Sequence, residues 1–173
     1  MAILWKIDPA HSEIRFKVKH LMISTVTGSF NSFEGTIETY DEALVRGKSI
    51  DFTAATDSIF TNHPERDAHL KSMDFFDVGL YPQIKFKAFR FKIKEGEIRG
   101  DLTIKGTTKS IVLQTTFGGI SEDAEGKLRA GFSATGKVNR KEFGLSWDDV
   151  TNVGNVIVAD QVILSAEIEL VKD

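Results

Sequence analysis

Apolar and polar residues alternate along several stretches of this chain, which is the pattern of a β-strand with one buried face. In residues 12–19 the side chains of Ile14, Phe16 and Val18 share one face, and mostly charged residues occupy the other. The same period of two recurs in three later segments, at residues 97–105, 128–138 and 162–170. These four segments are therefore predicted to be strands that cover a hydrophobic core.

Four further strands are indicated between turns rich in glycine and acidic residues, at residues 29–40, 46–56, 83–94 and 109–117. In the third of these the apolar positions shift from even to odd numbers after Ala88, which a bulge or a barrel corner would explain. One segment departs from the alternation, because it begins with Pro64, continues with acidic residues, and places Leu70 and Met73 at helical spacing. We therefore predict an all-β protein with about eight strands and one short inserted helix near residues 64–74.

Eight strands that each have one polar face favour a closed antiparallel β-barrel, because closure removes exposed edges and gathers the apolar faces inside. A sandwich of two sheets is the alternative. We expect a single domain over residues 1–173, since no linker, internal repeat or low-complexity tract divides the chain. A barrel of this size either fills with its own side chains or encloses one slim ligand.

The sizes of the inward-facing residues favour the hollow barrel. Ala130, Ala134 and Gly136 share the inward register of one strand, and Ala166 has that register in the last strand. The chain has 13 phenylalanines but only two tryptophans and two tyrosines, so large rings without polar groups can line the interior. The sequence thus predicts an apolar cavity for a hydrocarbon ligand. An ordinary packed core of phenylalanines fits the same composition.

Charge and composition exclude several other classes of protein. The formal net charge is -3 and the lysines alternate with apolar residues, so nucleic acid is not an expected partner. No stretch approaches about 20 apolar residues, and we expect no membrane-spanning segment. The chain contains no cysteine, which excludes disulfides and thiolate chemistry. Residues 1–9 do not have the pattern of a signal peptide, so we expect a mature amino terminus and a cytoplasmic location.

Three ordered blocks of residues make the whole chain resemble the YceI-like, polyisoprenoid-binding family. They are Asp8-Pro9-Ala10-His11-Ser12 with Phe16, Lys19-His20-Leu21-Met22 and Gly28-Ser29-Phe30; Asp57-Ser58-Ile59, Thr61, Arg66-Asp67, His69-Leu70, Asp74-Phe75-Phe76-Asp77 and Tyr81-Pro82; and Gly136, Asn139-Arg140 and Phe143-Gly144-Leu145. The resemblance implies a lipocalin-like, eight-stranded antiparallel barrel whose long pocket accepts isoprenoid chains and similar lipids. Many members of that family carry an export signal, which this sequence does not show.

We accordingly predict storage or transport of a long-chain isoprenoid, a quinone-like molecule or a fatty lipid. Ten residues are predicted to line its tail: Phe16, Val18, Phe30, Phe52, Phe75, Phe86, Phe132, Ala134, Phe143 and Trp147. Five polar residues are predicted to contact its head group: His20, Thr61, Arg66, His69 and Arg140. The amides at a helix amino terminus favour an anion, and an arginine can bind a phosphate with two hydrogen bonds. Alternatively, Arg66 and Asp67 only fasten the helix to the barrel.

We expect no enzyme activity, no cofactor and no metal site. The sequence has neither a Gly-x-Ser-x-Gly elbow nor a glycine-rich phosphate loop, and His63 and His69 are six residues apart, a poor spacing for zinc on one helix face. The alternatives are a lipid-modifying enzyme that uses His69 with Asp67 or Asp74, and an interaction module of the stress response with a solid core. Exposed apolar residues near a barrel mouth would also allow a homodimer.

Overall fold

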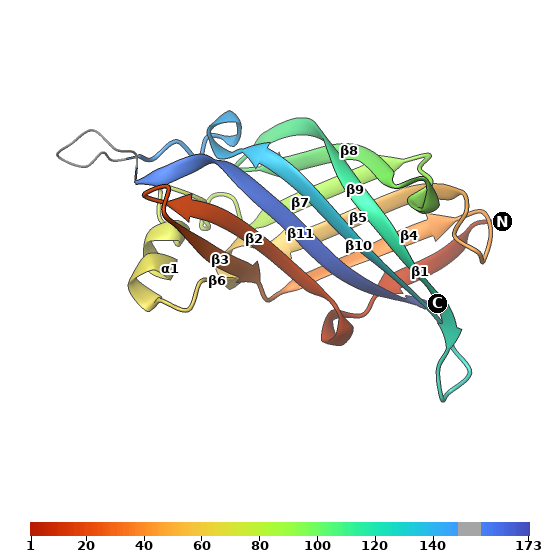
Figure 1. Cartoon of the computed structure of the whole chain (residues 1–173). Helices are drawn as coiled ribbons and strands as arrows, with labels where there is room; N and C mark the ends of the chain where they lie inside the picture. Colours follow the sequence, from red (N-terminus) through yellow and green to blue (C-terminus); the bar gives the residue numbers. More distant parts are fainter. Residues whose placement is uncertain (149–156) are drawn as a thin grey trace.

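One antiparallel sheet contains all the strands of the computed structural model, which describes residues 1–148 and 157–173 (Figure 1). Its strands in chain order are β1 (Ile3–Ile7), β2 (Glu13–His20), β3 (Ser24–Phe30), β4 (Phe33–Thr39), β5 (Gly47–Ala55), β6 (Ile59–Phe60), β7 (Gln83–Phe89), β8 (Glu97–Ile104), β9 (Thr107–Glu122), β10 (Leu128–Asn139) and β11 (Val158–Lys172). The α-helix of the described residues is α1 (Pro64–Lys71), and short 3-10 helices are η1 (Pro9–His11), η2 (Thr56–Ser58), η3 (Ile93–Glu95) and η4 (Arg140–Phe143).

Eight of these strands close into a ring. The order around it is β1, β4, β5, β7, β8, β9, β10 and β11, and β11 pairs again with β1, where Ile7 lies opposite Leu170. Every pairing is antiparallel. The prediction of an eight-stranded antiparallel barrel is confirmed, and the sandwich alternative is wrong.

The three remaining strands extend the wall of the barrel at one end. β2 pairs with β11 beyond β1, so η1 is a bend within one long strand. β3 and β4 are likewise separated by a short interruption: Phe33 of β4 pairs with Ala54 of β5, and Phe30 of β3 pairs with Ile59 of β6. The end formed by β2, β3 and β6 also carries α1, and we refer to it as the α1 end (Figure 1).

Several predicted boundaries differ from the structure. Residues 29–40 form parts of two strands, because the chain bends between Phe30 and Phe33. Strand β1 was not predicted. The predicted segment 83–94 ends as a strand at Phe89, and the shift in its apolar positions is a turn at Arg90, whose φ of 53° is left-handed, followed by η3. The helix ends at Lys71 rather than at residue 74.

The apolar positions of the alternating segments are buried in the barrel. In β7 every second residue is buried, and β8 follows the same rule over most of its length. At the far end of the barrel Trp5 is 0% exposed, and its indole N–H donates to the Thr39 hydroxyl over 3.1 Å. This buried hydrogen bond satisfies the ring nitrogen, as burial of a tryptophan requires.

Both termini lie at the end opposite α1 (Figure 1). The amide of Asp173 donates to the carbonyl oxygen of Leu4 over 2.9 Å, and the Asp173 carboxylate pairs with Lys6 at 3.1 Å. The first and last strands are therefore tied together where the barrel closes. None of the described helices is long and apolar enough to cross a lipid bilayer.

A close approach between two strands requires glycine at position 100. A methyl group added to Gly100 would contact the Phe86 ring and would lie 2.7 Å from the carbonyl oxygen of Lys87, a backbone atom that cannot swing away. We predict that Gly100→Ala lowers the free energy of unfolding by about 1–3 kcal/mol, the usual cost of overpacking. Urea unfolding measures this change. In Gly79→Ala, where no atom lies within 4 Å, the free energy should stay within about 0.5 kcal/mol of wild type; equal effects of both substitutions would contradict the prediction.

Candidate functional site

An apolar cavity of about 220 Å³ lies inside the barrel. Aliphatic and aromatic side chains from most of the barrel strands line it, together with residues from α1 and the segment that follows it. Among the described residues, the polar members of the lining are Arg15, Arg140 and Ser165. A cavity with so few polar partners suits a hydrocarbon better than water.

Nine of the ten residues predicted to contact a lipid tail line this cavity: Phe16, Val18, Phe30, Phe52, Phe75, Phe86, Phe132, Ala134 and Phe143. The tenth, Trp147, is half-buried and packs against the core next to Phe75, with ring centroids 5.4 Å apart. The inward register of the strands thus brings together residues that are far apart in the sequence.

Small residues help to leave this space open. Ala134 on β10 lies directly opposite Ala166 on β11, and both line the cavity. Nearer the α1 end, the aromatic rings pack against one another: the centroid of Phe30 is 5.7 Å from that of Phe16 and 5.7 Å from that of Phe76. The cavity therefore has alanines along part of one wall and a cluster of rings toward the α1 end.

Sequence reasoning missed several other lining residues. Ile84, Leu102 and Leu164 alternate with polar neighbours in strands, so the same pattern could have identified them. Phe76 and Leu145 also line the cavity, but they lie outside helices and strands, where no periodicity marks a buried side chain.

His69 packs against two aromatic rings at the α1 end. Its ring is 4.8 Å from that of Trp147 and 5.1 Å from that of Phe75, with both contacts edge-on. Its Nε2 atom is 2.8 Å from a carboxylate oxygen of Asp74. The imidazole is partly exposed, so this histidine can donate or accept a hydrogen bond at the border between the core and solvent.

Thr61, Arg66 and Asp67 bind one another. The Asp67 carboxylate is buried and accepts hydrogen bonds from the amide of Thr61, at 2.9 Å, and from the Thr61 hydroxyl. Arg66 donates to the Thr61 hydroxyl over 2.8 Å and to its carbonyl oxygen over 2.6 Å. In addition, His63 caps the helix by accepting from the amide of Arg66. These contacts support the alternative in which Arg66 and Asp67 fasten α1 to the barrel.

Arg140 is 4% exposed, and backbone carbonyl groups surround its guanidinium. It donates to the carbonyl oxygens of Leu145 and Trp147 at 2.6 and 2.7 Å, of Ala159 at 2.9 Å and of Val158 at 3.3 Å. The arginine thereby holds the segment after η4 against the start of β11. Its side chain also lines the cavity, which the other four predicted head-group residues do not.

The five predicted head-group residues therefore form two groups. Thr61 and Arg66 lie together next to α1. Arg140 binds the carbonyl of Trp147, whose ring contacts His69, and it also binds the carbonyl of Val158, the residue paired with His20. His20, His69 and Arg140 thus lie at the α1 end of the barrel, where Arg140 lines the cavity.

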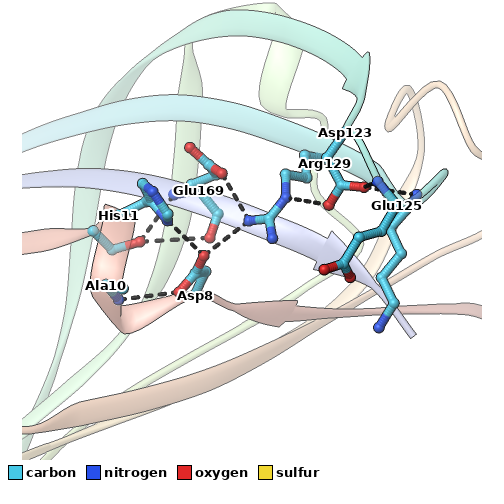
Figure 2. A network of polar contacts seen from close by, with 9 residues as sticks. Asp8, Ala10, His11, Asp123, Glu125, Arg129 and Glu169 are labelled. Carbon is cyan, nitrogen blue, oxygen red and sulfur yellow. Dashed lines mark hydrogen bonds and ion pairs between the residues drawn. The ribbon is translucent and has the colours of Figure 1, made fainter.

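A second polar cluster lies at the bend η1 between β1 and β2 (Figure 2). Asp8, His11 and Glu169 offer ligand atoms within 4.8 Å of one another, a spacing that a metal ion could use. However, Arg129 donates to Asp8 at 2.8 Å and to Glu169 at 2.9 Å, and its Nε atom donates to Asp123 at 2.8 Å. The guanidinium already supplies the positive charge that these carboxylates need.

This cluster fixes the bend at η1. The Asp8 carboxylate also accepts from the amide of Ala10, and the Ser12 hydroxyl bonds to the backbone of Glu169. Hydrogen bonds from the His11 ring and then from Arg129 hold the pKa of Asp8 below its ordinary value. The hydrogen bond from Arg129 does the same for the pKa of Asp123.

Comparison with known proteins gives three related findings. The family model described as the YceI-like domain matches residues 5–170. A protein YceI of Salmonella newport is 37% identical over 172 residues, which are 96% of this chain and 87% of the relative. The crystal structure of the Campylobacter jejuni YceI protein is 33% identical, with a TM-score of 0.76 and 90% of each chain covered.

A fourth similarity concerns the fold alone. The structure of a polyisoprenoid-binding domain from Saccharophagus degradans superimposes with a TM-score of 0.74 over 98% of each chain, at 12% sequence identity. The same barrel is therefore built by a very different set of side chains.

The cluster around Arg129 should make stability depend on pH. Asp8 and Asp123 have folded-state pKa values below the ordinary 3.8, so their contribution is present above about pH 4–5 and is lost as the pH falls through their folded-state pKa values. We predict that Arg129→Met lowers the melting temperature at pH 7, and that its difference from wild type shrinks at pH 3. Calorimetry at both pH values tests this; a difference that is independent of pH would contradict it.

The buried position of Arg140 predicts a large structural effect of its loss. Arg140→Met leaves four carbonyl groups without their donor, and we expect the free energy of unfolding to fall by about 3 kcal/mol or more. In Arg66→Met, an exposed arginine with fewer bonds is lost, and the expected change is under about 1 kcal/mol. Urea unfolding of the two variants measures the contrast, and similar losses would show that burial does not decide the effect.

Proposed function

Because the chain belongs to the YceI-like family, we propose that it stores or transports a long-chain isoprenoid or a similar amphiphilic lipid inside its barrel. The observation that supports this proposal most directly is the apolar cavity, lined by nine of the ten residues chosen for a lipid tail. The similarly folded domain from Saccharophagus degradans is described as polyisoprenoid-binding, which agrees in ligand class. The cavity also argues against a solid-core interaction module.

The tail supplies the affinity in this proposal. Each methylene group that moves from water into the cavity contributes about 0.8 kcal/mol, and the apolar wall offers no competing hydrogen bonds. Ordering the tail and losing its free motion oppose binding by about 4–15 kcal/mol. A ligand must therefore be long to bind well, which favours an isoprenoid, a quinone-like molecule or a fatty acyl chain over a small apolar compound.

The head group of the ligand is proposed to lie at the α1 end, near His20, His69 and Arg140. His69 and His20 are partly or largely exposed there, and Arg140 lines the cavity. Thr61 and Arg66 bind each other, so a contact with the ligand would have to be added to their existing hydrogen bonds. Each hydrogen bond to a charged head group adds only about 1.5–3 kcal/mol, so these residues would select among lipids.

One contact favours a second candidate function, a lipid-modifying enzyme. His69 Nε2 lies 2.8 Å from the Asp74 carboxylate, and such a histidine–carboxylate pair can act as a general base. We assign no nucleophile beside this pair. Prolonged incubation with a prenyl diphosphate distinguishes the two functions. Conversion of this compound by wild type, and its loss in His69→Ala with binding preserved, would favour the enzyme. An unchanged compound supports binding alone.

The interior position of Ala134 provides a test of the binding proposal. Ala134→Phe places a ring in the cavity opposite Ala166, and we predict that the affinity for a fluorescent polyprenyl probe falls at least about tenfold. Thr135→Phe adds the same ring to the exposed face of β10 and should leave the affinity unchanged. Fluorescence titration measures both, and circular dichroism verifies that both variants fold.

A complementary measurement uses native mass spectrometry of gently purified protein. We expect a co-purified lipid with wild type and with Thr135→Phe, and less of it with Ala134→Phe. A wild-type protein that carries no lipid and takes up neither polyprenyl nor quinone probes would contradict the proposed function.

A further inference from the structure

The hairpin between β2 and β3 exposes large apolar side chains at its tip. Met22 is 64% exposed and Ile23 is 82% exposed, although a hairpin tip in water is normally polar. The segment that follows α1 exposes two more, Met73 and Leu80. Scattered exposed apolar residues need no explanation, but consecutive ones at a projecting tip suggest a contact with an apolar partner.

The backbone of this tip is also unfavourable for the residues that it contains. Leu21 and Met22 have φ values of 51° and 59°, and the amide of Ile23 donates to the carbonyl oxygen of His20 over 3.1 Å. A hairpin turn with two left-handed residues favours asparagine and glycine. The sequence therefore keeps leucine and methionine where smaller, more polar residues would make a more stable turn. Such a conflict at an exposed site points to a function of the side chains themselves.

The charges of the hairpin itself have one sign. From Lys17 to Phe30 the chain contains Lys17, Lys19 and His20 and no acidic residue. On the neighbouring strand β11, the acidic residue nearest in sequence to the paired Val158 is Asp160, and it binds Lys141 at 3.1 Å. The hairpin therefore combines an apolar tip with positively charged residues in the strand that leads to it. This distribution favours binding to a membrane with anionic lipids.

The hairpin lies beside the α1 end of the cavity. The amide of Leu21 donates to the carbonyl oxygen of Ile157 over 2.8 Å, and Val18 and Val158, which flank this contact, line the cavity. Figure 1 shows the hairpin and α1 at the same end of the barrel. A surface that contacts this tip would consequently face the cavity end at which we place the head group.

We propose that Met22 and Ile23 insert into the surface of an anionic lipid bilayer, so that the α1 end of the barrel faces the membrane from which the ligand is taken or to which it is delivered. The choice of a lipid surface as partner rests on the proposed function. The insertion itself requires only the apolar tip and its lysines.

Replacing the tip residues with ones that suit its backbone should reduce vesicle binding without lowering the stability of the protein. In the double variant Met22→Asn with Ile23→Thr, asparagine tolerates the left-handed conformation and threonine keeps a β-branched side chain. We expect the melting temperature to rise slightly or stay unchanged. Binding to vesicles of phosphatidylglycerol and phosphatidylethanolamine without any isoprenoid, measured by flotation, should fall at least about tenfold. The control is Phe89→Thr at the last residue of β7, which removes an exposed ring at the opposite end of the barrel and should bind vesicles as wild type does.

Several outcomes would overturn the proposal. Wild-type protein that does not float with these vesicles, equal binding by the double variant, or equal loss in Phe89→Thr would each do so. A wild-type dimer in light scattering that the double variant abolishes, without vesicle binding, would show that the tip contacts a second copy. Because the vesicles contain no isoprenoid, docking without uptake of a polyprenyl probe would contradict the proposed function and leave the docking surface in place.

Discussion

The last strand, β11, holds the barrel closed because it pairs with β10 along one edge and with both β1 and β2 along the other. This double pairing is possible only because the chain bends at η1 between β1 and β2. The hydrogen bonds of Ser12 with the backbone of Glu169, and those of Arg129 with Asp8 and Glu169, attach the bend to β11. Closure, and with it the enclosed cavity, therefore depends on a small polar cluster outside the core.

The ionic groups near the cavity serve mainly to hold irregular segments in place. Arg140 binds four carbonyl groups of the chain after η4 and at the start of β11, and Asp67 binds Thr61 just before α1. Segments without regular pairing would otherwise bury unsatisfied carbonyl and amide groups. The α1 end can therefore carry long connections beside an apolar interior, which regular strands alone could not provide.

The strands and the cavity lining could be predicted from the sequence because a period of two assigns each residue to a face. Phe86 and Phe132 were identified in this way. The sequence left two roles open for Arg66 and did not indicate the backbone contacts of Arg140. The same arginine can bind a phosphate or a backbone carbonyl, and the choice depends on contacts that local sequence does not reveal. The bend after Phe30 was missed although the sequence marks it, because Asn31 and Ser32 shift the apolar positions from even numbers to odd numbers at Phe33.

The two chain ends leave the barrel from the side opposite α1 (Figure 1). A tether fused to either terminus, or a solid support attached through one, would therefore not obstruct the hairpin of Met22 and Ile23 or the nearby cavity end. The protein could be immobilised in a defined orientation with its α1 end directed outward. Since the chain has no cysteine, a single thiol introduced beside Asp173 would give one unique attachment point.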